Sequence, residues 1–572
     1  MTTAPPTRVP QEGRRLPDSL LPLACCCVVS FLILIPFFAW GAASGHDFEF
    51  HAASWFDAAY QWQEGILYPR WTAWTNHGFG EPRFIFYPPL SWMLGGLLTL
   101  LVPDPAIPMV YIVLTQTLAG LSAYLLLRRL ASRRGALLGA VFYTVNPDAL
   151  LMIYIRSDFA EQLACALFPL LLLAALELCE LLADSPATTR TIVSFAYVYA
   201  GVWLCNAPAG VIASYTMALL IVWAGLAQHS WRILARGASA LALGLGLASF
   251  YIVPAAYEQR WVNIGQALAS GLAPSENFLF TSIADPEHTW FNWIASICAL
   301  ALIILFGLAA LFSRRLTESG VGAAQNRRAF VGLLIAGTAA TALTLRWTLP
   351  LWSYLPKLRF VQFPWRWMSI LALVCACFVA AAGEKWRGRI SITLVLAMTV
   401  PLAWFLARNT WWDSDEMATM HDAVTSGTGF DGTDEYDPLG DDHLDLPSDA
   451  PLTKVLGSEN SDDHAAPQAL VQVAKWTTEN KEIRVESSEP ARIALRLLNY
   501  PAWRVEVNGK AVQTERADDI NQMIIPVPAG RSQIDVRFTR TADRKIGNAI
   551  SLLSALLTII LFRIGGTRIR AD

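Results

Sequence analysis

Long apolar segments, each about the length that a helix needs to cross a lipid bilayer, alternate with short polar ones through most of the chain. The first ends near Trp40, and no small-residue cleavage site follows it, so we expect a retained anchor and not a signal peptide. The later segments expected to cross are 107–127, 135–153, 162–183, 191–207, 209–228, 234–254, 290–312, 329–346, 364–382, 390–408 and 546–564. The pattern predicts an α-helical polytopic membrane protein with about twelve transmembrane helices.

Segment 88–103 is apolar but short, and it contains Pro88-Pro89 and Gly95-Gly96. If it crossed the membrane, the four arginines between residues 128 and 134 would lie outside, against the positive-inside rule. We therefore predict an interfacial or re-entrant helix, with both chain termini in the cytoplasm. The cationic residues that this topology leaves on the cytoplasmic side include Arg8, Arg14, Arg15, Arg314, Arg315, Arg327, Arg328, Lys385, Arg387, Arg389, Arg563, Arg568 and Arg570.

Composition agrees with a membrane protein. Apolar residues make up 54% of the chain and charged residues 16%, and 22 tryptophans are typical of proteins with aromatic belts at two membrane interfaces. All 9 cysteines lie in apolar segments, so they predict neither a disulfide nor a thiolate metal site in an exposed loop. We expect a transmembrane region at 1–408 with an outer loop at 44–87, an extracytoplasmic region at 409–545, and a final helix with a basic tail at 546–572.

The extracytoplasmic region has two halves of different character. Segment 413–463 is rich in Asp and Gly, which is compatible with a calcium site, but its spacing does not match a calcium-binding helix–loop–helix, so a flexible acidic linker is the favoured interpretation. After it, apolar residues alternate with period two, and Asn508-Gly509 is a strong signal for a two-residue hairpin. We therefore predict a C-terminal β-sandwich.

The most distinctive polar motif, Gly45-His46-Asp47-Phe48-Glu49-Phe50-His51, follows the first apolar segment on the outer face. In an extended backbone, Asp47, Glu49 and His51 share one side. Two carboxylates beside a bilayer favour a general base or a metal site. The alternative interpretation is an acidic loop that is merely solvated.

Two further groups of charged residues fall on the same predicted face. Arg156, Asp158 and Glu161 are compatible with a role in binding or with an ion-paired cap on a helix terminus. Arg359 and Arg366 flank an aromatic cluster at the start of an apolar segment, where guanidinium groups can pair with phosphate or extend to lipid headgroups.

Several sequence strings resemble a known family. They are Gly45-His46-Asp47, Tyr68-Pro69-Arg70-Trp71, Gly78-Phe79-Gly80-Glu81-Pro82, Phe86-Tyr87-Pro88-Pro89-Leu90 and Leu358-Arg359-Phe360-Val361-Gln362-Phe363-Pro364-Trp365-Arg366-Trp367. They resemble the bacterial membrane proteins labelled 6-pyruvoyl-tetrahydropterin-synthase-related. The end of the chain, with Tyr500-Pro501-Ala502-Trp503 and Val527-Pro528-Ala529-Gly530, is similar to YfhO-type proteins. Both groups are similar to glycosyltransferases of the GT-C class.

The resemblance implies an inverting glycosyltransferase of a bacterial plasma membrane. Its donor would be a polyprenyl-phosphate-linked sugar, its acceptor an extracytoplasmic lipid, polysaccharide or protein, and nucleic acid is not an expected partner. The alternative is a non-catalytic scaffold, or a transporter for lipid-linked envelope polysaccharide. Few ionisable residues lie at the centres of the predicted spans, which argues against a proton-coupled pump.

The same resemblance implies roles for individual residues. Asp47 and Glu49 would be the catalytic carboxylates. Asp47 would be the base, and Glu49 would hold the acceptor or, together with Asp47, a divalent cation such as Mg²⁺ or Mn²⁺, the one cofactor expected. The two carboxylates could also exchange roles. The donor phosphate would be bound by Arg359, Arg366 and Arg70. Residues expected to contact the acceptor or support the site are His46, His51, Arg156, Asp158, Glu161, Tyr87 and Gln362.

Overall fold

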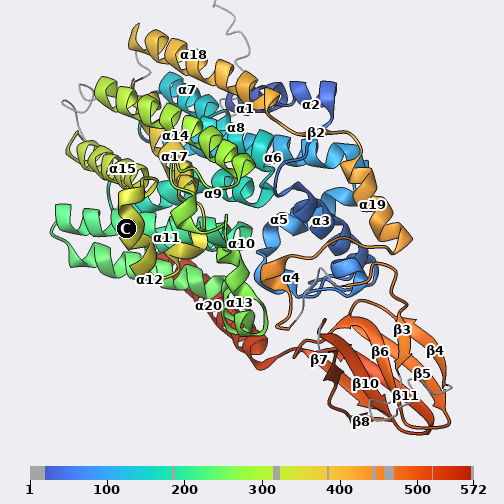
Figure 1. Ribbon diagram of the computed structural model, residues 1–572. Coiled ribbons are helices and arrows are strands. Elements are labelled where there is room, and N and C mark those ends of the chain that lie inside the picture. The colour runs from blue at the N-terminus through green and yellow to red at the C-terminus, as the bar shows by residue number, and fades with distance from the viewer. Residues whose placement is uncertain are drawn as a thin grey trace, which may run out of the picture.

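The computed structural model describes residues 20–182, 187–313, 323–382, 386–440, 446–456, 469–517 and 520–567. Figure 1 shows long helices stacked beside one another, a β region at one end of the molecule, and short helices between them. Eight cationic residues on which the predicted topology depends lie outside the described residues, namely Arg8, Arg14, Arg15, Arg314, Arg315, Lys385, Arg568 and Arg570.

Helices occupy every segment that the apolar pattern predicts to cross the membrane. Among the described residues, 8 are long and apolar enough to cross, or up to 10 if two bent pairs count as one span each. The predicted α-helical membrane architecture is therefore confirmed, whereas the count of twelve is not. The bounds are α1 (Leu20–Ile33), α2 (Ile35–Trp40), α6 (Ile107–Leu127), α7 (Arg133–Thr144), α8 (Pro147–Leu151), α9 (Phe159–Leu178), α10 (Thr189–Cys205), α11 (Ala207–Ala227), α12 (Trp231–Leu247), α13 (Ser249–Glu258), α14 (Pro286–Ser313), α15 (Ala323–Leu343), α16 (Leu349–Tyr354), α17 (Met368–Ala382), α18 (Trp386–Arg408) and α20 (Ala542–Thr567).

The segment predicted not to cross the membrane forms α5 (Pro89–Thr99), which begins just after Tyr87-Pro88. Its 11 residues extend over about 16 Å, roughly half of a bilayer's hydrocarbon thickness. After α5, Asp104 Oδ2 accepts a hydrogen bond from Nδ1 of His421 in α19 (Glu416–Ser426), at 2.6 Å. The turn after α5 therefore lies on the same side of the molecule as α19, in agreement with a helix that does not cross.

We expect Pro105→Cys, in a background without native cysteines, to react with an impermeant thiol reagent added to intact cells. Pro105 is exposed in the turn between α5 and α6, so the introduced thiol is accessible from the side that also carries α19. Labelling that occurs only after permeabilisation would reverse the proposed orientation of the whole chain. A cysteine at Arg133, at the opposite end of the adjoining span, is the matched control and should label only after permeabilisation.

The C-terminal β region consists of two antiparallel sheets, with strand orders β3-β6-β10-β9 and β4-β5-β11-β7-β8. Alternating apolar residues from both sheets share one core, including Ile483 and Val536 from one sheet and Ile493 and Ile525 from the other. The predicted β-sandwich is thus present. The bounds are β3 (Thr453–Leu456), β4 (Ala469–Trp476), β5 (Asn480–Ser487), β6 (Ala491–Leu498), β7 (Trp503–Val507), β8 (Lys510–Ala511), β9 (Glu515–Arg516), β10 (Gln522–Val527) and β11 (Gly530–Phe538).

The predicted hairpin joins β7 to β8, with Val507 opposite Lys510. Its two central residues have positive φ, 52° at Asn508 and 73° at Gly509, as a type I′ turn requires. Asn508 Oδ1 also accepts a hydrogen bond from the backbone N–H of Gln533, at 2.9 Å.

Replacing Gly509 with valine is expected to destabilise the β region by about 1–2 kcal/mol. A Cβ atom at this position meets no other atom within 4 Å, so the cost is backbone strain and not a clash. The thermal unfolding midpoint of the purified protein measures it. Gly509→Asn is the matched control and should cost less, because asparagine tolerates positive φ better than valine. Equal destabilisation by the two variants would contradict this explanation.

The β region packs against the first outer segment of the helical region (Figure 1). Trp71 is fully buried there, with its ring 5.4 Å from Trp503 and 5.7 Å from Tyr500. Beside them, the buried carboxylate of Glu258, at the end of α13, accepts hydrogen bonds from Arg544 of α20 at 2.6 and 2.7 Å and from the hydroxyl of Tyr500 at 2.6 Å. These contacts hold the β region against the helices.

The prediction of a flexible linker is wrong for residues 412–440. Strand β2 (Trp412–Asp413) pairs with β1 (Ala42–Ala43), and α19 packs against α3 (Phe48–Gln63). Apolar side chains such as Met417 and Met420 are buried in these contacts. The sequence did not indicate their burial, because acidic residues dominate the composition of this segment. The parts of the acidic segment at 441–445 and 457–463 lie outside the described residues.

Candidate functional site

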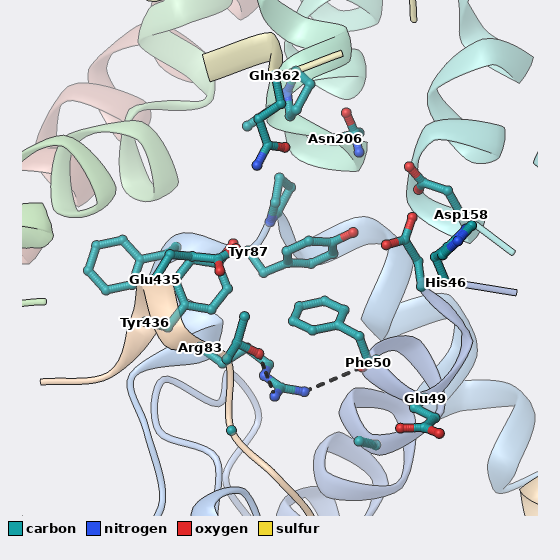
Figure 2. A pocket seen from close by; sticks show the side chains of 18 of the residues that line it. His46, Glu49, Phe50, Arg83, Tyr87, Asp158, Asn206, Gln362, Glu435 and Tyr436 are labelled. Carbon is teal, nitrogen blue, oxygen red and sulfur yellow. Dashed lines mark hydrogen bonds between the residues drawn. The ribbon is translucent and has the colours of Figure 1, made fainter. Parts of the chain in front are cut away.

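A cavity of about 540 Å³ lies between the N-terminal end of α3, the start of α11, the segment after Gln362 and the loop before the β region. Figure 2 shows side chains from these separate parts of the chain pointing into it. Of the site residues predicted from sequence, seven line this cavity, namely His46, Asp47, Glu49, Tyr87, Asp158, Gln362 and Arg366. The predicted outer-face motif is therefore part of a cavity and not a solvated loop.

The prediction of an extended backbone at Asp47–His51 is wrong, because α3 begins at Phe48 with Asp47 as its N-cap residue. Buried positions at Phe48, Ala52 and Trp55 continue with helical spacing, which a seven-residue window is too short to reveal. The Asp47 side chain makes no capping hydrogen bond and is 41% exposed. Its nearest cation is Arg156, with 3.8 Å between Oδ2 and Nη2.

The helix separates the three residues that an extended strand would have aligned. Two positions along a helix correspond to a rotation of about 200°, so Glu49 projects away from the side of Asp47. Figure 2 shows Glu49 well apart from Asp158, although both line the cavity. His51 is buried behind the wall, with its Nε2 3.7 Å from Asp158 Oδ1.

Behind Asp47 lies a buried network of two arginines and two carboxylates. Arg156 binds Asp158 at 2.5 Å and Glu161 at 2.8 Å. Arg366 approaches the same carboxylates, at 3.1 Å from Glu161 Oε2 and 3.6 Å from Asp158 Oδ2. Because each charge faces an opposite one, the network is electrically balanced, and Asp47 at its exposed edge adds a negative charge.

Local backbone geometry holds this network in place. Asp158 caps α9, accepting a hydrogen bond from the backbone N–H of Glu161 at 2.8 Å. Ser157 before it has φ of 52°, and its hydroxyl accepts a hydrogen bond from the backbone N–H of Gly45. A Cβ on Gly45 would lie 2.3 Å from the carbonyl oxygen of Ile155, so only glycine allows this approach.

Burial alone would raise the pKa of Asp158, but the adjacent guanidinium group of Arg156 outweighs it and holds that pKa below its ordinary value. Asp158 is therefore ionised at neutral pH and unsuited to deliver a proton. The sequence left two interpretations of Arg156, Asp158 and Glu161, a role in binding or an ion-paired helix cap. The two are compatible, because Asp158 caps the helix and also lines the cavity.

The three arginines predicted to bind phosphate have different positions. Arg366 is 7% exposed, lines the cavity and donates to the carbonyl of Val361 at 3.1 Å. Arg359 is exposed over the ring of Phe360, and Arg70 lies over the ring of Tyr68 near the β region. Neither Arg359 nor Arg70 lines the cavity.

The remaining predicted residues frame the cavity. His46 is exposed, and its ring meets the edges of Phe291 and Trp411. The ring of Tyr87 packs 4.6 Å from that of Phe50. Gln362 donates to the carbonyl of Ala267 at 2.8 Å and accepts from Arg366 at 3.3 Å.

Sequence reasoning missed the opposite wall of the cavity. Arg83 is buried, binds Glu81 at 2.6 Å and donates to Thr433 at 3.0 Å, which fixes the loop carrying Glu435 and Tyr436 over the cavity. Burial, with the neighbouring carboxylates, raises the pKa of Glu435 to about 7. The only sequence signal was the acidic density of this loop, which gave no indication of which carboxylate faces the helical region.

The described residues contain no group of three or more His, Cys, Asp or Glu side chains arranged to hold a metal ion. Asp47 and Glu49, the two predicted ligands, project from different sides of α3. The predicted divalent-cation site therefore stays a prediction, and no step below depends on one.

The solved structures similar to the chain include the following three. ArnT from Cupriavidus metallidurans bound to undecaprenyl phosphate has 12% identity and a TM-score of 0.39, covering 71% of this chain and 75% of that one. The oligosaccharyltransferase of Archaeoglobus fulgidus in the apo form has 14% identity and a TM-score of 0.40, covering 70% and 56%. Arabinofuranosyltransferase AftD from Mycobacteria has 17% identity and a TM-score of 0.39, covering 68% and 27%. The chain thus spans just over half of the second protein and about a quarter of the third.

A comparison with curated proteins found no match. A family model described as a 6-pyruvoyl-tetrahydropterin synthase related domain, membrane protein, matches residues 84–412. The matched range covers more than half of the 572 residues and includes Arg156, Asp158 and Arg366, while Asp47 precedes it. The chain therefore belongs to the 6-pyruvoyl-tetrahydropterin synthase related family of membrane proteins.

Proposed function

We propose that the protein is a membrane glycosyltransferase that transfers a sugar from a polyprenyl-phosphate-linked donor to a hydroxyl group of an extracytoplasmic acceptor, with inversion at the anomeric carbon. The observation that carries the proposal is one cavity that combines an accessible carboxylate, Asp47, with a buried guanidinium group, Arg366. These are the two groups that such a transfer needs, a base for the acceptor and a cation for the leaving phosphate.

In the proposed reaction, Asp47 accepts the proton of the acceptor hydroxyl. The hydroxyl oxygen forms a bond with the anomeric carbon, while the bond from that carbon to the phosphate oxygen breaks and its electron pair leaves with the phosphate. Arg366 pairs with the anionic phosphate, and its contacts with Glu161 and Gln362 orient the guanidinium group. Arg156, which is buried behind the cavity wall, forms an ion pair with the carboxylate of Asp47.

The size and lining of the cavity support this assignment. Its volume of about 540 Å³ lies within the usual range for small-molecule sites. Aromatic side chains such as Phe50, Tyr87 and Tyr436 provide surfaces for a sugar ring, and Arg83 and Glu435 provide polar groups opposite Asp47. The start of α11 and the segment before α17 bring apolar helices to its edge, as a lipid-linked donor requires.

The proposal is tested with purified protein in proteoliposomes and a panel of radiolabelled polyprenyl-phosphate sugars. We expect donor-dependent formation of a labelled product with inverted anomeric configuration, compared with liposomes lacking the protein. If the protein bound or took up the donor but neither formed a new glycosidic bond nor hydrolysed the donor, the result would instead favour a transporter or scaffold. Addition of a chelator, followed by Mg²⁺ or Mn²⁺, measures the predicted dependence on a divalent cation.

A further inference from the structure

A second cavity, of about 370 Å³, lies where the β region meets the C-terminal end of α3. Its walls come from four separate parts of the chain: α3, the outer segment after it, the loop following α19, and strands of both sheets. Figure 1 shows α3 and the β strands approaching one another in this part of the molecule. None of the predicted donor, acceptor or catalytic residues lines it.

Aromatic side chains dominate the accessible part of this second cavity. Tyr60, Trp74 and Trp476 are each partly exposed in its walls. The rings of Tyr60 and Trp74 meet edge to face, with centroids 5.3 Å apart. Partly exposed tryptophan and tyrosine rings combine apolar faces with polar edges, which suits ligands that are apolar on one side and polar on the other.

Polar groups in the same walls lack protein partners. Thr478 is 4% exposed, and neither its Oγ1 atom nor Nε1 of Trp74 has a hydrogen-bond partner among the described residues.

Lys481 adds an unusual amine to these walls. It is 3% exposed, donates to the carbonyl of Thr478 at 2.6 Å, and lies over the rings of Trp503 at 4.3 Å and Trp476 at 5.6 Å. Burial lowers the pKa of Lys481 to about 7, so a fraction of the molecules carries a neutral amine near neutral pH. A neutral amine both donates and accepts hydrogen bonds, as a sugar hydroxyl does.

We propose that this second cavity is a binding site for a glycan chain, separate from the reaction cavity. Sugar rings present an apolar face of C–H groups and an edge of hydroxyl groups, and the cavity offers aromatic surface together with the partly exposed polar side chains of Glu64, Thr477 and Arg496. The two cavities lie at opposite ends of α3, about 20–25 Å apart along the helix, and the loop at 426–436 contributes to both. A chain bound here would extend along one face of the protein toward Asp47.

The test is isothermal titration calorimetry of the full-length protein in nanodiscs with maltohexaose, cellohexaose, mannohexaose and arabinohexaose, and with a pool of random decapeptides. We expect saturable binding of at least one hexasaccharide, weakened about tenfold or more by Trp476→Ala and by Trp74→Ala. Trp476→Phe keeps an aromatic surface and should retain most of the affinity. Trp347, which is 69% exposed outside the cavity, supplies the matched control Trp347→Ala, expected to bind like the wild type.

The proposal would be overturned if none of the four hexasaccharides bound saturably, or if only the decapeptides bound. It would also be overturned if both alanine variants kept the wild-type affinity. Asp47→Asn should bind the hexasaccharide as the wild type does, because its side chain is in the other cavity. Glycan binding therefore stands or fails independently of sugar transfer, and failure of one leaves the other intact.

Discussion

Asp47→Asn is expected to lower sugar transfer in proteoliposomes by roughly 10²- to 10⁴-fold, the usual contribution of a general base. Asparagine keeps the size and shape of the side chain but cannot accept the proton of the acceptor hydroxyl. The fold should be preserved, because the Asp47 side chain makes no capping hydrogen bond and is partly exposed. Initial rates at saturating donor, with circular dichroism and the thermal unfolding midpoint as checks, measure the effect.

Glu49→Gln is the matched comparison for this prediction. Glu49 is exposed in the first turn of the same helix and lines the same cavity, but it projects from a different side. We expect a smaller loss of transfer than in Asp47→Asn. A near wild-type rate in Asp47→Asn would show that the base is another group, and a larger loss in Glu49→Gln would assign the role to Glu49.

The features that sequence predicted correctly depend on local rules. Runs of apolar residues give membrane-length helices regardless of what surrounds them. Asn508-Gly509 adopts positive φ because of its own backbone chemistry. These rules require no knowledge of distant parts of the chain.

The features that sequence did not predict depend on contacts between distant segments. Arg366 meets Glu161 and Asp158 across more than 200 positions, and Arg83 meets Thr433 across 350. The helical conformation at Asp47 was missed because the aromatic residues around it alternate with polar ones over a short window, while its buried side chains follow the helical period only over the whole of α3.

Arg366→Lys is expected to reduce transfer efficiency roughly ten- to a hundredfold, equivalent to about 1.5–3 kcal/mol for a charge-assisted contact with phosphate. Lysine keeps the positive charge but loses the planar fork, which at Arg366 approaches Glu161 at 3.1 Å and donates to Gln362 at 3.3 Å. The loss should appear mainly in the dependence of the rate on donor concentration, because the acceptor does not contact the phosphate.

Arg359→Lys is the matched control, since Arg359 is exposed and outside the cavity although only seven positions away. An arginine that merely extends to lipid headgroups accepts lysine with little change, so we expect Arg359→Lys to retain near wild-type efficiency. The thermal unfolding midpoint separates loss of binding from loss of the buried network around Arg366. Wild-type efficiency of Arg366→Lys, or an equal loss in Arg359→Lys, would contradict the assignment and move the phosphate toward Arg83 on the opposite wall, whose guanidinium group also lines the cavity.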